Sequence, residues 1–479
     1  MTAPAPPGRA PAGGRGRTGV VHRTGGLPVP GVRGLPLLGS VNDFRSDILA
    51  AMRAGFEAHG DLVGYRLGPV TVYGVSSPEL AGEALTDAAR FGKLGADNPL
   101  RLVLGTGLLT SSDHDSWMRN RRMMQPLYTR AKIAEMYATM RSSTDGWLDH
   151  LAREYRPGDQ LDLHKELMRV TLDIVSRCMF STNVLDDLDT IGPHAVDIAI
   201  NYAFQRLQNP FSPPVSWPTP GNRRFRRVMA SIDDLMYRLI AERRAAGPGD
   251  ADLLDALLTC RDADTGEAMT DRELRDEIIT TFAAGHETTA ITLTWTFYLL
   301  SQHPRVLRRL QEEVDGVLAG RTPTLADLPR LPYTLRVFEE AMRLYPSAPI
   351  VPRLANHDTT LGGHHLPAGA RVLVNLVNIQ RHPDHWPDPE RFDPDRFEPA
   401  ARKGWHRYAY LPFGAGPHLC IGKHFALMEA QLLLAALVAR YELRHLPAHR
   451  VVQHATITLR PRYGMEMTMH PRRRTTVAR

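Results

Sequence analysis

One cysteine of this chain lies in a setting typical of a metal ligand or a nucleophile. Residues 413–422 place Cys420 among three glycines and a proline, and strong helix formers follow over residues 423 to about 441. We therefore expect a tight loop that opens a helix, where backbone N–H groups and the helix N-terminus lower the pKa of a thiol. No second cysteine is near, which disfavours a tetrahedral zinc site. A glycine-rich turn around a buried structural cysteine is the alternative.

A second candidate site lies in the middle of the long helix predicted over residues 271–301. Gly285 follows Ala284 there, and Glu287 and Thr288 come one residue later, with a second threonine after them. Glycine inside a helix costs about 1 kcal/mol relative to alanine. Threonine hydroxyls can bond back to a carbonyl one turn earlier and bend the helix. The pattern indicates a notch beside an acid and a hydroxyl, and a helix-packing notch with a solvated glutamate is the alternative.

The cysteine loop resembles the haem-binding loop of the cytochrome P-450 superfamily. That pattern is Phe, two residues, Gly, one residue, Arg or His, one residue, Cys, one residue, Gly. It is met here by Phe413, Gly416, His418, Cys420 and Gly422. The resemblance implies that the thiolate of Cys420 binds the iron of haem b and that the other four residues shape the loop around the cofactor.

The helix notch resembles the central helix of the same family, whose pattern is Ala/Gly-Gly-x-Asp/Glu-Thr-Thr. Residues 284–289 match it at every position. The resemblance implies that Ala284 and Gly285 line an oxygen-binding notch beside the haem, that Thr288 supplies the hydroxyl in this notch, and that Glu287 relays protons to it. The thiolate on the other face of the haem donates electron density to the iron.

Cations of the chain are expected to hold the two haem propionates. Trp117 and Arg121 match the family's Trp-x-x-x-Arg pattern on one helix face, and Arg353 and His418 match positions where the family often keeps a basic residue. His114 is a further candidate. For each of them a surface side chain is the alternative.

A structural triad is also implied by the resemblance. Glu340 and Arg343 lie three residues apart on the helix predicted over residues 332–345, so they face one side of it. The family joins such a pair to an arginine of a Pro-rich segment, which we take to be Arg391, in Pro-Glu-Arg-Phe. We expect this triad to lock the segment behind the cysteine loop and to do no chemistry on substrate.

The positions that the family uses variably around the distal pocket are mostly apolar in this chain, which indicates a hydrophobic substrate. Ordinary core packing is the alternative for its aromatic members. A Pro-rich stretch, Trp217 to Pro220, resembles bacterial members that act on terpenes or fatty acyl chains. The candidate pocket residues are Phe91, Phe204, Phe282, Ala348, Ile350 and Ile457.

Composition excludes several classes of protein. The chain has 479 residues, 43% of them hydrophobic, so it can bury a large core and is not disordered throughout. The net charge of +6 is small for this length, and no basic run indicates nucleic-acid binding. The chain contains no stretch of about 18 consecutive apolar residues, so no transmembrane helix is predicted. The three cysteines, Cys178, Cys260 and Cys420, are far apart, which favours a reducing, cytoplasmic location over a disulfide framework.

The sequence predicts a mainly α fold with a minor antiparallel β region, which includes a hairpin formed by residues 62–67 and 70–75. Following the resemblance, we expect a cytochrome P-450 fold, a single large domain over residues 27–472 with haem between the central helix and the cysteine-loop helix. Residues 1–26 are predicted to be a disordered leader rich in proline, glycine and arginine, and residues 473–479 a basic tail. The protein is expected to be a monomer.

Together these features predict a haem-thiolate monooxygenase that inserts one atom of O₂ into a hydrophobic small molecule, such as a terpenoid, a fatty acyl compound or another intermediate of secondary metabolism. Three cysteines cannot hold a four-cysteine cluster, and no flavin segment is recognised, so a separate ferredoxin and its ferredoxin reductase are the expected electron donors. Arg119, Arg122 and Lys423 are candidate docking cations. The alternatives are a peroxide-driven haem enzyme, a non-catalytic haem sensor and a helical scaffold without cofactor.

Overall fold

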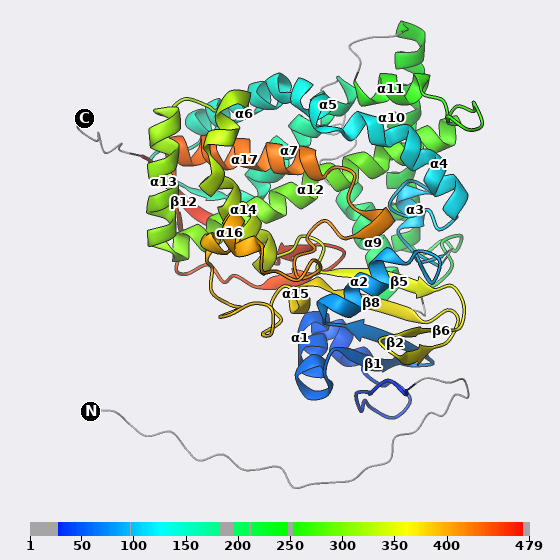
Figure 1. The fold of residues 1–479 in the computed structure, drawn as a ribbon. Coiled ribbons are helices and arrows are strands. Elements are labelled where there is room, and N and C mark those ends of the chain that lie inside the picture. Colours follow the sequence, from blue (N-terminus) through cyan, green and yellow to red (C-terminus); the bar gives the residue numbers. More distant parts are fainter. Residues whose placement is uncertain (1–26, 96, 182–194, 210–211, 248–251, 473–479) are drawn as a thin grey trace, which may run out of the picture.

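The computed structural model describes residues 27–95, 97–181, 195–209, 212–247 and 252–472. The predicted leader, residues 1–26, and the predicted tail, residues 473–479, lie outside this described part. Figure 1 shows helices filling most of the molecule, with α12 and α17 passing through its middle and a small sheet beside α1 at one end. The mainly α fold with minor β regions is therefore confirmed.

The described helices agree with most of the predicted helical segments. They are α1 (Val41–His59), α2 (Pro78–Thr86), α3 (Arg101–Leu104), α4 (His114–Met124), α5 (Arg130–Glu135), α6 (Tyr137–Glu154), α7 (Leu163–Phe180), α9 (Ala195–Gln208), α10 (Pro220–Ala246), α11 (Leu253–Thr259), α12 (Asp271–Gln302), α13 (Pro304–Leu318), α14 (Pro332–Leu344), α15 (Leu376–Ile379), α16 (Pro399–Arg402) and α17 (Lys423–Arg440), with 3-10 turns η1 (Gln125–Tyr128), η2 (Leu325–Arg330), η3 (Pro394–Phe397) and η4 (Gly416–His418).

The strands form four small sheets. They are β1 (Leu62–Leu67), β2 (Val70–Val75), β3 (Phe91–Gly92), β4 (Gln160–Asp162), β5 (Ile350–Ala355), β6 (Thr359–Leu361), β7 (His364–Leu366), β8 (Arg371–Asn375), β9 (Tyr441–His445), β10 (Gln453–Ala455), β11 (Leu459–Pro461) and β12 (Glu466–Pro471). The largest sheet has the order β1-β2-β8-β5-β3. The predicted β1–β2 hairpin is confirmed, and the one departure from antiparallel pairing in this sheet is the parallel pair β2–β8.

The central helix α12 is fixed at both ends by its own sequence. Thr270 and Glu273 form a reciprocal capping box at its start, and Pro304 begins α13 directly after α12 ends. Most side chains along α12 are buried, polar ones included. Gly285 is required for its packing on α7, because a Cβ there would lie 2.8 Å from Cγ2 of Val175.

None of the helices in the described part of the chain combines the length and the apolar character needed to cross a membrane.

A glutamate is buried without a partner on α17. Glu429 is fully inaccessible to solvent, and neither of its carboxylate oxygens has a hydrogen-bond partner among the described residues. Burial raises the pKa of this carboxyl well above its usual value, and the nearby hydroxyl of Thr289 on α12 lowers it without cancelling the effect of burial. Folding therefore favours the protonated form of Glu429.

The raised pKa of Glu429 makes a contribution to stability that depends on pH. The unfolded chain ionises Glu429 near its ordinary pKa, whereas the folded protein ionises it only at a higher pH, so its contribution to stability is complete below the ordinary pKa and is lost as the pH rises toward the folded value. The variant Glu429→Gln stays neutral at every pH. We expect the melting temperature of the variant minus that of wild type to be higher at pH 8 than at pH 5.

Thermal unfolding of both proteins at the two pH values measures this difference. Glu135→Gln, at an exposed acid paired with Lys132, is the matched control and should change little at either pH. An equal difference at pH 5 and pH 8 would show that Glu429 is ionised in the folded protein.

Candidate functional site

The loop of Cys420 is closed by hydrogen bonds within its own backbone. The N–H of Cys420 donates to the carbonyl of Phe413 at 2.9 Å, and the N–H of Gly414 donates to that of Leu411 at 2.9 Å. Gly416 has a φ of +69°, and a Cβ there would lie 2.4 Å from the carbonyl oxygen of Leu85, so no other residue fits. The loop predicted from the glycines is therefore present, and it leads into α17.

The thiol of Cys420 is less acidic than the sequence suggested. Burial among protein atoms raises its pKa, and the N–H of Gly422 and the charges of Arg121 and Lys423 lower it by less. The predicted influences are present, but the prediction of a lowered pKa is wrong for the chain by itself, because burial outweighs them. The side chain nevertheless remains accessible at its surface, which suits a ligand that approaches from outside the loop.

Positive side chains gather beside this loop. The charges of Lys93, Arg353, His114 and Arg121 all reach His418, and together with burial, the largest cause, they lower the pKa of His418 to about 3. Trp117 lies within this cluster: its ring is 4.2 Å from that of His418, centroid to centroid, and Nζ of Lys93 is 5.1 Å from its centroid. The indole N–H of Trp117 donates to the carbonyl of Leu108 at 3.2 Å.

The cation cluster of Lys93, Arg121 and Arg353, with His114 and the uncharged His418 beside them, contains no ion-paired anion among the described residues. None of the five forms an ion pair with another side chain in the part of the chain that the structure describes. Burial lowers the pKa of Arg353 to about 10, and burial followed by the charge of Arg353 lowers that of Lys93 to about 7. Nε of Arg353 and Nδ1 of His418 are buried without hydrogen-bond partners. Buried cations with orphaned donors suit the two carboxylates of haem, so these residues fit that cofactor.

Lys93 is a member of this cluster that the sequence analysis missed. It lies just after β3, far in the chain from the motifs, and no pattern around it is specific. Its amine donates to the carbonyl of Leu108, the same atom that accepts from Trp117. Glu277 of α12 opposes the lowering of its pKa. Only the fold brings Lys93 to this cluster, so the sequence could not identify it.

The notch residues of α12 face three different ways. Ala284 is exposed and Thr288 is partly buried, and Oγ1 of Thr288 donates to the carbonyl of Ala284 at 2.9 Å. The back-bonding predicted for this threonine is thus confirmed. Gly285 faces Val175 of α7, so its small size serves helix packing. Thr289 is buried on the side of Glu429. Thr288 is therefore the threonine that lies with Ala284 on the solvent-accessible side of α12.

Glu287 is not a solvated side chain. It is buried, with 5% of its surface exposed, and its Oε1 pairs with Nη2 of Arg460 at 2.8 Å. The hydroxyl of Thr458 donates to the same oxygen at 2.9 Å. Both partners belong to the hairpin of β10 and β11, so the acid of the notch is tied to a segment remote in sequence.

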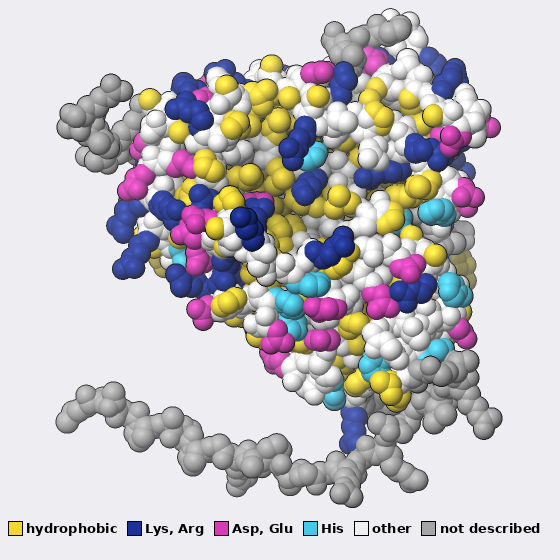
Figure 2. All heavy atoms as spheres, viewed as in Figure 1, with side chains coloured by type: hydrophobic (Ala, Val, Ile, Leu, Met, Phe, Trp, Pro, Cys, Tyr) yellow, Lys and Arg dark blue, Asp and Glu magenta, His cyan; other side chains and the backbone are white. Residues whose placement is uncertain are grey.

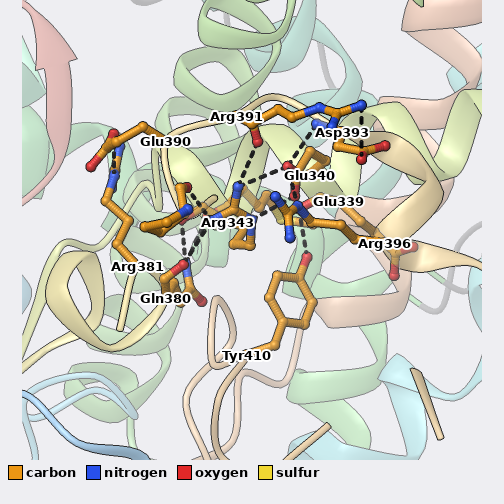
Figure 3. Close-up of polar contacts among 12 residues, drawn as sticks. Glu339, Glu340, Arg343, Gln380, Arg381, Glu390, Arg391, Asp393, Arg396 and Tyr410 are labelled. Atoms are coloured by element: carbon orange, nitrogen blue, oxygen red, sulfur yellow. Dashed lines mark hydrogen bonds and ion pairs between the residues drawn. The ribbon is translucent and has the colours of Figure 1, made fainter. Parts of the chain in front are cut away.

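Glu340 and Arg343 form the predicted pair, but the third arginine was misassigned. Nε of Arg343 lies 2.6 Å from Oε2 of Glu340, and both side chains are fully buried. Nε of Arg396 lies 3.5 Å from Oε1 of Glu340, whereas the side chain of Arg391 points to Asp393 and is mostly exposed (Figure 3). The chain carries two Pro-acid-Arg-Phe stretches five residues apart, and the second one supplies the triad.

The triad is connected to the cysteine loop. Arg343 donates to the carbonyls of Gln380, Pro389 and Arg391, at 2.9, 2.7 and 3.0 Å. The side-chain carbonyl of Gln380 in turn accepts from the N–H of Leu411 at 2.9 Å, two residues before Phe413. The structural role predicted for Glu340 and Arg343 thus has a continuous path to the loop.

The predicted pocket residues divide between core and partly open positions. Phe91 is 1% exposed in the core beside the five-stranded sheet, and Phe282 is 2% exposed, 6.3 Å from Phe180 of α7 by ring centroid. Both are core side chains. Ile350 packs on the core between α1 and the β1–β2 hairpin. The remaining three, Phe204, Ala348 and Ile457, are partly exposed.

Two of the three docking cations are already paired. Arg119 forms ion pairs with Glu267 and Glu273, and Arg122 pairs with Asp262 and Asp264, each at 2.9 Å. They are therefore poorly placed to receive a separate acidic protein. Lys423 keeps its amine over the ring of Phe413, 5.8 Å from the centroid, at the base of the cysteine loop.

Comparison with known proteins agrees with this geometry. The family model described as Cytochrome P450 matches residues 29–467. The chain is 37% identical to cyclooctatin synthase of Streptomyces melanosporofaciens over 92% of this chain and 93% of that protein. It is also 37% identical to cyclooctat-9-en-7-ol 5-monooxygenase of the same species, over 82% and 85%. Pentalenene oxygenase of Streptomyces avermitilis is 37% identical over 88% and 90%.

Among solved structures, the crystal structure of the cytochrome P450DA heme domain is similar in fold. Its TM-score is 0.86 at 28% sequence identity, and the likeness covers 94% of this chain and 98% of that chain. This chain belongs to the cytochrome P450 family, whose cofactor is haem held by a cysteine thiolate, and it is a monooxygenase.

Proposed function

We propose that the protein oxygenates a cyclic terpenoid, with the haem iron bound by Cys420 and the propionates bound by the cation cluster. The observation that carries the cofactor site is the orphaned pair of buried nitrogens, Nε of Arg353 and Nδ1 of His418, beside the Cys420 loop. Three relatives named as oxygenases or synthases of cyclooctatin and pentalenene compounds support the terpenoid class.

Haem, when bound, supplies the activation of O₂ and its transfer to substrate. The chain's own residues hold and pass protons. Thr288 donates to the carbonyl of Ala284, so its hydroxyl must rotate away from that carbonyl to donate into the notch. Glu287 lies one residue earlier on α12 and is the acid that would resupply the proton.

The first test concerns the iron ligand. Cys420→Ser should abolish the thiolate-type Soret band of the dithionite-reduced, CO-bound protein, because the serine oxygen is a poor substitute for a thiolate on this iron. Cys178→Ala and Cys260→Ala are matched controls that should keep the band. A Cys420→Ser protein that retains the band would show that another residue binds the iron.

The second test concerns proton delivery. Thr288→Ala should leave the haem spectrum nearly unchanged but lower the product formed per NAD(P)H consumed and raise the H₂O₂ released, because no hydroxyl then donates into the notch. Glu287→Gln should slow the proton-dependent step, and loss of one proton-transfer group typically costs about 10²–10⁴-fold in rate. Binding spectra with cyclic terpenes, beginning with pentalenene, select the test substrate.

Thr289→Ala is the matched control for this test. Thr289 faces Glu429 on the buried side of α12, so its loss should leave the ratio of product to H₂O₂ close to that of wild type. Strong uncoupling in Thr289→Ala with normal coupling in Thr288→Ala would contradict the assignment of the two threonines.

We propose that an acidic ferredoxin, reduced by its reductase, docks over the Cys420 loop. Figure 2 shows lysine and arginine side chains around an apolar hollow in the middle of one face, where Figure 1 places the start of α17. Lys423 begins α17 and the exposed Arg130 begins α5, and the charges of both contribute, after burial, to lowering the pKa of His424 below its usual value. Three free cysteines suit the reducing cytoplasm, where such donors work.

The third test concerns this donor. Arg130→Glu and Lys423→Gln should each raise the KM for ferredoxin with little change in kcat, and should weaken the salt dependence of the reaction. Arg33→Glu, an exposed arginine at the opposite, sheet-bearing end of the molecule, is the charge-matched control. Equal KM values in all variants would overturn the docking site, and turnover supported by H₂O₂ alone would favour a peroxide-driven enzyme.

A further inference from the structure

One peptide group of the loop between α3 and α4 joins the central helix to the cation cluster. The N–H of Leu108 donates to Oε2 of Glu277 on α12 at 3.0 Å. The carbonyl of Leu108 accepts from the indole N–H of Trp117 at 3.2 Å and from the amine of Lys93. A carbonyl oxygen has two lone pairs, so this one peptide can hold both donors. Two side chains beside the Cys420 loop are therefore tied to α12 through a single residue.

The backbone of this loop lies directly against α12. A Cβ at Gly107, the residue before Leu108, would lie 2.3 Å from Oγ1 of Thr280. The N–H of Thr106 donates to Oδ2 of Asp276 at 2.7 Å. A side chain at position 107 would thus push the loop off the helix. The peptide of Leu108 has a position that α12 defines.

The side chain of Glu277 matches the two donors that face it. It is fully buried, and its Oε1 accepts from Nδ2 of Asn120 at 3.1 Å while its Oε2 accepts from the N–H of Leu108. An ionised carboxyl group offers two acceptor oxygens and no donor, as two facing donors require. Burial raises the pKa of Glu277 to about 7, and the bonds from Leu108 and Asn120 lower it by less. A carboxyl group is buried here in spite of its desolvation cost, and both of its oxygens hold other elements.

Glu277 acts on the indole of Trp117 from two sides. Asn120 follows Trp117 by three residues on α4, so the two side chains share one face of that helix. Glu277 therefore holds the helix that carries the indole through Asn120, and the indole N–H through Leu108. The ring placed in this way lies 4.2 Å from that of His418, centroid to centroid.

The amine of Lys93 is placed by the same carbonyl. Its bond to Leu108 uses one of the three N–H groups of the ammonium, and the other two can serve a carboxylate. The amine also lies over the ring of Trp117, 5.1 Å from the centroid. The charge of Glu277 raises the pKa of Lys93 against the larger effect of burial, which favours the charged form that binds an anion.

We propose that Glu277 is a positioning residue for the groups that bind the haem carboxylates. Through the peptide group of Leu108 it fixes the donors of Lys93 and Trp117. Through Asn120 it also fixes the helix that carries Trp117. This inference rests on the proposed haem site, and it gives the first half of α12 a task in retaining the cofactor that is separate from the notch in its middle.

The test measures how fast the haem-loaded protein gives up its haem to an excess of apomyoglobin. Glu277→Met replaces the carboxylate by an apolar chain of similar length and removes both acceptors. Asp276→Leu is the matched control, because it replaces an acid that holds the same loop at Thr106 but leaves the contacts of Leu108 in place. Glu277→Gln is the conservative variant: its oxygen accepts from Leu108, and the amide of Asn120, whose Oδ1 is buried without a partner, can turn over to accept from the new NH₂.

Glu277→Met should lose haem roughly 5-fold faster than wild type, the factor that one weakened hydrogen bond is worth. Its resonance Raman spectrum should show a shifted propionate bending mode, because this mode reports on hydrogen bonds to the haem carboxylates. Asp276→Leu and Glu277→Gln should stay near wild type in both measurements. In a Lys93→Met/Trp117→Phe background, Glu277→Met should add little, because the donors that it positions are gone.

Asn120→Leu is a milder variant that keeps the test valid if Glu277→Met does not fold. It removes only the hold on α4, so it should speed haem loss by a smaller factor and shift the same Raman mode.

Unchanged haem loss in both Glu277→Met and Asn120→Leu would overturn the proposal. An equal acceleration in Asp276→Leu would also overturn it, because general loosening of the loop would then be the cause. Glu277→Gln losing haem as fast as Glu277→Met would assign the effect to charge instead of position. A full effect of Glu277→Met in the Lys93→Met/Trp117→Phe background would show that Glu277 acts by another route.

Failure of the proposed haem site itself looks different. Wild type would then lack the thiolate-type CO band. Glu277→Met would still lower the melting temperature, because the bonds from Leu108 and Asn120 to Glu277 do not depend on the cofactor.

Discussion

The buried ion pair of Glu340 and Arg343 holds the segment that leads to the Cys420 loop. Both side chains are fully buried, and the guanidinium of Arg343 also donates hydrogen bonds to three backbone carbonyls of the segment from Gln380 to Arg391. Gln380 then holds the backbone of Leu411. Removing one partner of such a pair leaves an uncompensated charge, at a cost of about 3–5 kcal/mol. The geometry around Cys420 therefore depends on an interaction that takes no part in the chemistry.

The helix α12 combines three tasks within residues 285–289. Gly285 allows α7 to approach, Thr288 is partly open to solvent, and Thr289 faces the buried acid Glu429 of α17. Successive residues of a helix are about 100° apart, so Thr288 and Thr289 necessarily meet different neighbours. The short motif of this helix therefore combines helix packing at Gly285 and Thr289 with the partly open hydroxyl of Thr288, to which we assign a role in proton delivery.

The sequence was sufficient where a local pattern carries its own physical reason. The glycine geometry of the Cys420 loop, the length of α12 and the β1–β2 hairpin all follow from neighbours in the chain, and the structure agrees. It was insufficient where distant segments meet. Two similar Pro-acid-Arg-Phe patterns could not be told apart until Arg396, and not Arg391, was seen beside Glu340. Nothing in the sequence near Lys93 indicates that it joins a cluster assembled from several elements.

The same limit explains why the raised pKa of the Cys420 thiol was not predicted from the sequence. Backbone donors and nearby cations could be inferred from the loop, whereas the burial that raises the pKa of Cys420 depends on the whole fold. Without a ligand, the fold disfavours charged side chains at two places. Burial opposes ionisation of the Cys420 thiol, and it also opposes the positive charge of Arg353, which has no ion-pair partner among the described residues. Haem carries an iron that stabilises a thiolate and two carboxylates that neutralise cations. One ligand relieves both costs at once, so the electrostatic imbalance of the protein is itself a source of affinity and orientation for its cofactor.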